Sequence, residues 1–140
     1  TSSHFHSIAH HFNELSDFAE QHPRTRMVLS HLGVLDMREA PNFSSHQQIV
    51  ALAAHANIFV QISGMHMFSQ PPYTDLVPLI EQLWDAYGPQ RLLYGSNYPV
   101  MGEDPMYEQE IDLLKTGRLG IPVDDLEQVL SKTATELWFE

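Results

Sequence analysis

Three short apolar segments recur at a nearly constant interval, and each ends in a small residue that leads into a turn. They cover residues 27–30, 58–63 and 91–95. Their last residues, Ser30, Ser63 and Gly95, are separated by 33 and 32 residues. That interval is the length of a strand, a loop, a helix and a short return, which is typical of β/α units with parallel strands. The spacing therefore predicts an α/β fold.

Amphipathic helices are expected before, between and after these segments. Apolar residues at helical spacing predict helices over about residues 7–21, from Ser44 to Asn57, from Thr74 or Asp75 to Tyr87, from Asp104 to Gly117 and from Asp124 to Trp138. Ser44 with Gln47, and Asp124 with Glu127, have the spacing of a capping box. Asn57 is expected to end its helix in the left-handed conformation.

Composition narrows the class of protein and of partner. The chain has 140 residues, 43% of them hydrophobic and 18% charged, which indicates a globular domain with a core. It contains neither a run of about 18 apolar residues nor a signal peptide, so we expect a cytoplasmic protein without a membrane partner. The net charge of -11 argues against nucleic acid, and the acidic residues after position 100 are expected on solvated helix faces. Without cysteine, a transition metal must be held by His, Asp or Glu.

Length sets a limit on the architecture. A (β/α)8 barrel occupies about 250 residues, so 140 residues supply about half of one. The first residue is Thr, and the opening helix has no strand before it. We therefore expect residues 1–140 to be a fragment of a longer protein. The alternative is a complete small doubly wound sheet, but such sheets normally have more than the three strands predicted here.

Each predicted strand is followed by residues that can carry chemistry. SHLG at 30–33 contains His31, NIFVQISG at 57–64 leads into a loop that contains His66, and RLLYGSNYPV at 91–100 contains Asn97 and Tyr98. Together with the closing SKTATELWF at 131–139, these segments resemble the C-terminal half of the amidohydrolase-related family of metal-dependent hydrolases and decarboxylases. The resemblance implies a partial (β/α)8 TIM barrel, roughly strands six to eight with their helices, and an active site at the C-terminal ends of the strands.

The resemblance also implies roles for two strand-end residues. In the family, a divalent metal is held by a His-x-His pair on strand one, histidines on strands five and six, and an aspartate on strand eight. On that map His31 is the strand-six histidine, either a metal ligand or an acid/base, and Asn97 stands where the aspartate is usual. An asparagine cannot take a proton from water, although its carbonyl oxygen can accept a weak metal bond or its amide can orient a ligand. A divalent metal, with zinc as the expected ion, therefore stays an open expectation, and Asn97 with Tyr98 and Pro99 alternatively only shapes the loop.

The remaining candidates are secondary. His66 and Tyr98 are predicted to contact substrate, with Met65, Met67 and Phe68 as apolar neighbours of His66. His4 and His6 copy the His-x-His spacing, because residues two apart on a strand face the same side. They stand directly before a helix, so only His6, as a strand-five histidine, is kept as a further metal candidate. The histidines expected to be exposed are His10, His11, His22, His46 and His55.

The function implied is hydrolysis of a lactone or of an ester of a small organic acid, with water activated by the strand-end histidine. Asn97 in its Ser-Asn-aromatic-Pro turn resembles the lactonase-like branch of the family. Two alternatives stay open, namely a non-oxidative decarboxylase of the same family and a truncated barrel without catalytic activity. The expected partner is a small-molecule substrate, and the open sheet edges of half a barrel predict a homo-oligomer.

Overall fold

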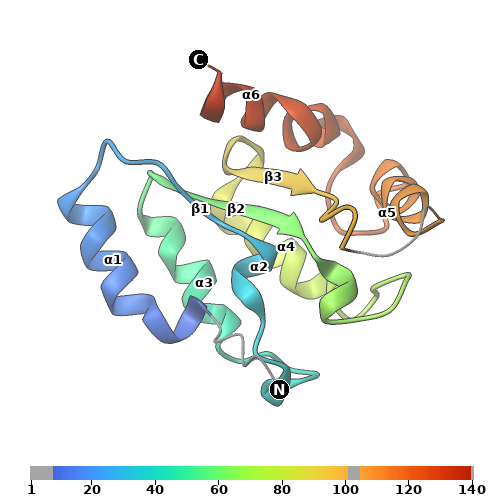
Figure 1. Ribbon diagram of the computed structural model, residues 1–140, viewed down its shortest axis with the longest axis horizontal. Helices are drawn as coiled ribbons and strands as arrows, with labels where there is room; N and C mark the ends of the chain where they lie inside the picture. Colours follow the sequence, from blue (N-terminus) through green and yellow to red (C-terminus); the bar gives the residue numbers. More distant parts are fainter. Residues whose placement is uncertain (1–7, 101–104, 140) are drawn as a thin grey trace.

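A parallel three-stranded sheet forms the centre of the protein. The computed structural model describes residues 8–100 and 105–139. Within them the strands β1 (Met27–Leu29), β2 (Ile58–Ser63) and β3 (Leu92–Gly95) lie in the order β1-β2-β3, and both pairs are parallel. Their arrowheads point the same way in Figure 1. The strands match the predicted segments to within one residue at each end, which confirms the predicted α/β fold.

Helices and short helical turns make up most of the rest of the described chain. In order they are η1 (Ile8–His11), α1 (Phe12–Gln21), α2 (His31–Val34), η2 (Met37–Glu39), α3 (His46–Ala51), η3 (Leu52–Ala54), η4 (Met65–Met67), α4 (Val77–Tyr87), η5 (Pro89–Arg91), α5 (Pro105–Lys115), η6 (Val123–Asp125), the π-helical turn η7 (Gln128–Lys132) and α6 (Thr133–Trp138). None of the helices in the described ranges is long and apolar enough to cross a membrane.

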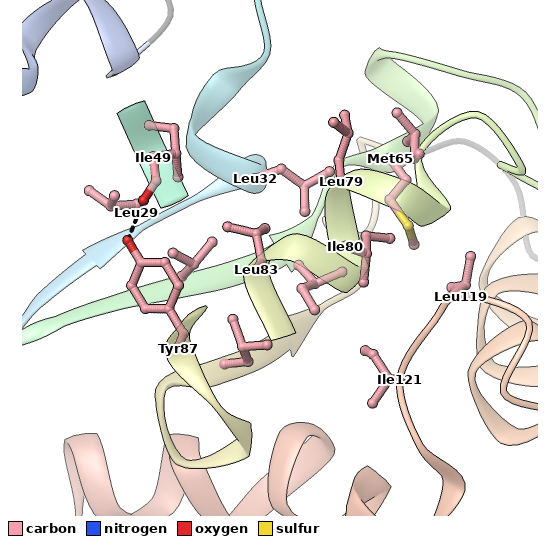
Figure 2. Close-up of a cluster of buried hydrophobic side chains, with 14 of the residues drawn as sticks. Leu29, Leu32, Ile49, Met65, Leu79, Ile80, Leu83, Tyr87, Leu119 and Ile121 are labelled. Carbon is pink, nitrogen blue, oxygen red and sulfur yellow. Dashed lines mark hydrogen bonds between the residues drawn. The ribbon is translucent and has the colours of Figure 1, made fainter. Parts of the chain in front are cut away.

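The core lies between the sheet and the helices around it, and it includes residues of α1, α3, α4, α5 and η7. Alternate residues of a strand point to opposite faces, so Ile58, Val60 and Ile62 are fully buried while Phe59 and Gln61 are half-buried. The apolar face of α4 packs against the buried face, as Figure 2 shows for Leu79, Ile80 and Leu83. In the same view the hydroxyl of Tyr87 donates a hydrogen bond to the carbonyl oxygen of Ile49 at 2.6 Å, which joins α4 to α3.

Arg91 fastens the start of β3 to the ends of two helical segments. Its guanidinium donates hydrogen bonds to the carbonyl oxygens of Ala53 (3.0 Å), His55 (3.0 Å), Ala86 (3.3 Å) and Tyr87 (3.2 Å). These carbonyls lie at or near the C-terminal ends of η3 and α4, where a cation is favourable. Arg91 thus fixes where β3 begins relative to the preceding helices.

The start of α3 differs from the prediction. The capping box of Ser44 with Gln47 is not formed, because α3 begins at His46 and its N-cap makes no side-chain hydrogen bond. The carboxylate of Glu39 instead accepts a hydrogen bond from the N–H of Ser45 at 2.8 Å. A residue just before the predicted box therefore satisfies a backbone N–H at this end of the helix.

Asn57 also differs from its predicted role. It does not have the positive φ expected of a helix-ending asparagine. Its side-chain amide instead donates hydrogen bonds to the carbonyl oxygens of Ala19, His22 and Thr25, at 3.0 to 3.2 Å. Asn57 therefore joins the end of α1 to the start of β2.

Two further predicted helix caps are also not formed, and a third lies outside the described residues. Asp75 accepts a hydrogen bond from the Ser69 hydroxyl and does not cap α4, which begins two residues later. Glu127 pairs with Lys132 at 2.9 Å and does not complete a box with Asp124. The predicted cap Asp104 lies outside the described residues.

Candidate active site

His31, Ser63 and Asn97 lie at the same edge of the sheet. His31 follows β1 after one residue, Ser63 ends β2, and Asn97 lies two residues beyond β3. Because the strands are parallel, with Ser63 opposite Gly95 in register, their C-terminal ends meet at one edge. Figure 1 shows α2 and the segments that follow β2 and β3 at the arrowhead end of the sheet. In the (β/α)8 barrel that the sequence resembles, the active site lies at this edge of the sheet.

The backbone at His31 turns sharply as it leaves the sheet. Four consecutive residues have positive φ, with values of 55° at His31, 56° at Leu32, 76° at Gly33 and 54° at Val34. A left-handed conformation costs about 1–2 kcal/mol for each residue other than glycine. Such outliers persist where the surrounding structure fixes them, and they cluster at functional sites. The tight turn keeps the His31 side chain close to the end of β2.

The His31 side chain is held by Ser63. The imidazole Nδ1 lies 2.9 Å from Ser63 Oγ, and the backbone N–H of His31 donates to the same oxygen at 3.2 Å. Ser63 Oγ in turn donates to Gln61 Oε1 at 3.2 Å. Gly64, with φ of 62°, leaves the space that the ring needs, because a Cβ atom at Gly64 would lie 2.7 Å from His31 Nδ1. Gln61 and Ser63 on β2, with Gly64 directly after the strand, therefore set the position of the His31 ring.

The environment keeps His31 neutral. Burial lowers the pKa of His31 below its ordinary value of 6.5, the nearby His66 lowers it further, and a backbone interaction with Ser63 opposes the shift. Burial likewise lowers the pKa of His66. The Nδ1 atom of His66 is buried and has no hydrogen-bond partner within the described ranges. A neutral imidazole at a strand end is suited to accept a proton or to bind a metal.

Asn97 lies beside the same group of side chains. Its Nδ2 is 3.9 Å from Met67 Sδ, and that sulfur would lie 2.9 Å from a Cβ atom at Gly64, the position next to His31 Nδ1. Met67 therefore links Asn97 to the surroundings of His31. Asn97 has φ of 58°, a conformation that asparagine adopts more readily than most residues. The residue thus shapes the loop and also presents an amide at the sheet edge.

The other predicted site residues are placed less closely. Tyr98 is 61% exposed, and its N–H donates to Ser96 Oγ at 3.2 Å. Of the expected apolar neighbours of His66, Met65 and Phe68 belong to the hydrophobic core and Met67 is partly buried against it. His4 and His6 lie outside the described residues.

One histidine prediction is wrong. His46 is only 1% exposed, and its Nε2 donates to the carbonyl oxygen of Leu79 at 3.2 Å. The close contact between α3 and α4 encloses its ring, and its position three residues before the buried Ile49 puts it on the apolar side of α3. His10, His11 and His22 are exposed as expected, and His55 is half-buried.

Glu110 was missed by sequence reasoning, which placed the acidic residues of this region on solvated faces. It is fully buried on α5, where its carboxylate accepts hydrogen bonds from the hydroxyls of Tyr73 at 3.0 Å and Tyr94 at 2.9 Å. Burial raises the pKa of Glu110, and the two tyrosine hydrogen bonds oppose that shift. The cluster joins the loop after β2, the strand that leads to Asn97, and α5. The three residues lie far apart in sequence, so their contact could not be predicted, but helical spacing from Leu113 and Leu114 was a local signal that Glu110 faces the apolar side of α5.

The described residues do not form a metal site by themselves. Across residues 8–100 and 105–139, no group of three or more His, Asp or Glu side chains converges to hold an ion. A zinc site normally has at least three protein ligands. His31 offers one nitrogen and Asn97 one neutral oxygen, which is fewer than such a site requires.

The match to known families agrees with this arrangement. Residues 2–139 match the family model described as amidohydrolase. The chain belongs to the amidohydrolase family. Among its curated relatives, the L-fucono-1,5-lactonase of Burkholderia ambifaria is 31% identical over 93 residues, which cover 64% of this chain and 32% of the lactonase.

Solved structures of amidohydrolases share the fold. One is an amidohydrolase from Burkholderia multivorans with bound zinc, with a TM-score of 0.75, 18% identity, and coverage of 93% of this chain and 49% of that protein. Another is a putative 2-pyrone-4,6-dicarboxylic acid hydrolase from Pseudomonas putida, with a TM-score of 0.65, 18% identity, and coverage of 88% and 48%. The chain spans about half the length of these structures. The expected architecture, part of a (β/α)8 barrel, is confirmed.

Proposed function

We propose that this chain supplies strands six to eight and the catalytic base of a hydrolase that opens lactones or esters of small organic acids. The observation that carries the proposal is the neutral His31 imidazole, held by Ser63 at the strand-end edge and linked through Met67 to Asn97. The curated relative that is an L-fucono-1,5-lactonase supports the choice of a lactone.

In the proposed reaction His31 acts as a general base. It takes a proton from a water molecule while the water oxygen attacks the carbonyl carbon of the lactone. The bond between that carbon and the ring oxygen then breaks, and the proton passes from His31 to the leaving alkoxide. The product is the open hydroxy acid. A positioned base typically contributes about 10²–10⁴-fold to such a step.

Asn97 is proposed to hold the substrate rather than to move protons. Its Nδ2 faces Met67 Sδ at 3.9 Å, and a thioether sulfur is a weak acceptor. The amide therefore keeps donor capacity that a substrate carbonyl oxygen can use as negative charge develops on it. His66 and Tyr98, on the loops after β2 and β3, are proposed to border the same substrate.

No step of this proposal passes through a metal ion. The amidohydrolase from Burkholderia multivorans has bound zinc, but the described residues of this chain fall short of a zinc donor set. His31 and Asn97 would be the residues of the described ranges that contribute ligands. The others, His6 among the candidates, would come from outside those ranges.

The experiment is turnover on a panel of sugar lactones by the intact enzyme and its variants. His31→Ala should lower kcat by about 100-fold or more, within the range that general base catalysis supplies. His22→Gln is the matched control, because His22 is exposed and distant from the sheet edge, and it should leave turnover unchanged. Full activity in a folded His31→Ala protein would refute the proposal. Release of carbon dioxide from carboxylic acids, without lactone turnover, would instead favour the decarboxylase alternative.

A further inference from the structure

Within the described residues, the Ser63 hydroxyl has three polar contacts, and the residue is almost completely buried. Ser63 is 1% exposed, so its hydrogen must go to a protein group. The three contacts are Gln61 Oε1 at 3.2 Å, the backbone N–H of His31 at 3.2 Å and His31 Nδ1 at 2.9 Å. A hydroxyl has one hydrogen and two acceptor lone pairs, which matches three contacts in number.

These contacts decide the direction of the hydrogen bond to the imidazole. The Gln61 carbonyl oxygen can only accept, so it takes the single hydroxyl hydrogen of Ser63. The backbone N–H of His31 can only donate, so it uses one lone pair. One lone pair is left for His31 Nδ1, which must therefore carry a hydrogen. In a neutral imidazole only one ring nitrogen is protonated, so Nε2 is the unprotonated one.

We propose that Gln61 and Ser63 are positioning residues that hold His31 in the tautomer with its hydrogen on Nδ1, which leaves Nε2 free to accept a proton or a ligand. This inference rests on the proposed function for its catalytic meaning, but the tautomer itself is a property of the described residues. The two residues lie on β2 on the face opposite the buried Ile62. They belong to the strand that lies between β1 and β3.

Gly95 makes this arrangement possible. A Cβ atom at Gly95 would lie 2.5 Å from Gln61 Nε2 and 2.9 Å from Gln61 Cδ. Any larger residue would push the Gln61 amide away from its present position beside Ser63. The glycine of the neighbouring strand thus provides the space in which Gln61 reaches the hydroxyl.

The test is the tautomer of His31, read from nitrogen-15 spectra of protein labelled at the histidine rings. His31 signals are assigned by their loss in His31→Gln. At pH 8 the expected result is a protonated Nδ1 and an unprotonated Nε2, the reverse of the tautomer that free histidine prefers in water. If the Gln61 amide presented its NH2 group to Ser63, the hydroxyl would donate to Nδ1 and the hydrogen would lie on Nε2. Protonated Nε2 in the unmodified protein would therefore overturn the proposal.

Variants separate this role from a general structural one. Gln61→Glu keeps an acceptor and should keep the Nδ1-protonated tautomer, and Ser63→Thr should keep it because the hydroxyl remains. Gln61→Leu, of similar size, and Ser63→Ala should shift His31 toward the Nε2-protonated tautomer. Ser63→Ala should also lower kcat by about 10–100-fold with little change in KM, the effect usual for groups that orient a catalytic histidine. An unchanged tautomer in both Gln61→Leu and Ser63→Ala would contradict the proposal.

Failure of this inference and failure of the proposed function give different results. The tautomer is measured without turnover. If Nδ1 is protonated as expected but His31→Ala is fully active, the proposed function fails while the hydrogen-bond assignment stands. If His31→Ala is inactive but Nε2 is protonated in the unmodified protein, the assignment to Gln61 and Ser63 fails alone.

Discussion

At the scale of a single residue, Asn97 both permits the left-handed backbone of its turn and places an amide group at the sheet edge. Its φ of 58° places it in the left-handed region, which asparagine and aspartate tolerate better than most residues. The same position would hold an aspartate in the usual pattern of the family that the sequence resembles. Replacing the carboxylate by an amide keeps the turn but removes a negative charge from the sheet edge.

Asn97→Asp should therefore raise zinc affinity without disturbing the loop. An anionic oxygen binds a divalent cation more strongly than a neutral amide, so we expect about tenfold tighter binding or more in the intact enzyme. Titration calorimetry and metal analysis by mass spectrometry measure the change. Asn97→Gly is the control, because it permits the same φ and adds no ligand. Equal zinc affinity in the two variants would show that the side chain at position 97 does not contribute to zinc binding.

His46 should make stability depend on pH. Burial lowers its pKa in the folded protein below the ordinary value of 6.5. As the pH falls through 6.5, His46 becomes protonated in the unfolded chain but stays neutral in the folded protein. The free energy of unfolding therefore decreases. Between pH 7.5 and 5.5 this contributes up to about 1.4 kcal/mol. His46→Leu should reduce the pH dependence in urea unfolding, whereas His22→Leu, at an exposed position, should leave it unchanged. The same slope in all three proteins would contradict this assignment.

At the scale of elements, the Glu110 cluster connects segments that the sheet alone does not join. The carboxylate on α5 receives the hydroxyls of Tyr73, in the loop after β2, and Tyr94, on β3. Asn97 lies three residues after Tyr94, and Met67 lies six residues before Tyr73. The cluster therefore helps to fix the separation between the two loops that meet at Met67 and Asn97.

Glu110→Ala should destabilise the protein by about 1–3 kcal/mol or more, because it leaves buried tyrosine hydroxyls without their acceptor. Glu110→Gln, which keeps one carbonyl oxygen, should cost less. Glu108→Ala removes an exposed carboxylate from the same helix and is the matched control. Urea unfolding measures all three. A Glu110→Ala protein as stable as Glu108→Ala would mean that the cluster contributes nothing to the fold.

The elements themselves were predictable from sequence, whereas many of their connections were not. The apolar runs that became β1, β2 and β3 are read from local composition, and so are the strand-end positions of His31 and Asn97. Asn57 failed as a cap because its amide binds carbonyl groups 32 to 38 residues away. Near Ser44 and at Asp75 the competing partners are local, since Glu39 and Ser69 each lie six residues from the residue that they bind.

Two buried polar residues were missed although helical spacing indicates their burial. His46 lies three and four residues before Ile49 and Val50, and Glu110 lies three and four residues before Leu113 and Leu114, so each shares the apolar face of its helix. They were assigned to solvent because histidine and glutamate are usually exposed. Gln61 differs, because its role depends on the absence of a side chain at Gly95 on the next strand, which no local pattern indicates.

At the scale of the whole molecule, the sheet has two open edges. In the described residues β1 and β3 each pair on one side only, with β2. The half-buried Phe59 lies on the face of β2 turned away from the core. The solved amidohydrolases that share the fold are about twice as long as this chain. Open edges of this kind favour pairing between chains.

The isolated 140-residue chain should therefore associate. Sedimentation velocity should show oligomers whose size increases with concentration. A Val28→Lys substitution places a charge on the β1 edge strand and should reduce association, whereas Val28→Thr, which keeps the β-branched shape, should not. A dispersed monomer that melts cooperatively would contradict the expectation and favour a complete domain.

The central claim, that a neutral His31 is the catalytic base, is tested most directly by the pH dependence of kcat/KM for lactone hydrolysis by the intact enzyme. Because burial and His66 lower the pKa of His31, activity should reach its plateau by neutral pH and should fall at lower pH as the imidazole becomes protonated. The acidic limb should therefore have its midpoint below 6.5, and it should disappear from the residual activity of His31→Gln. An acidic limb that is unchanged in His31→Gln would show that another group is the base and would contradict the account.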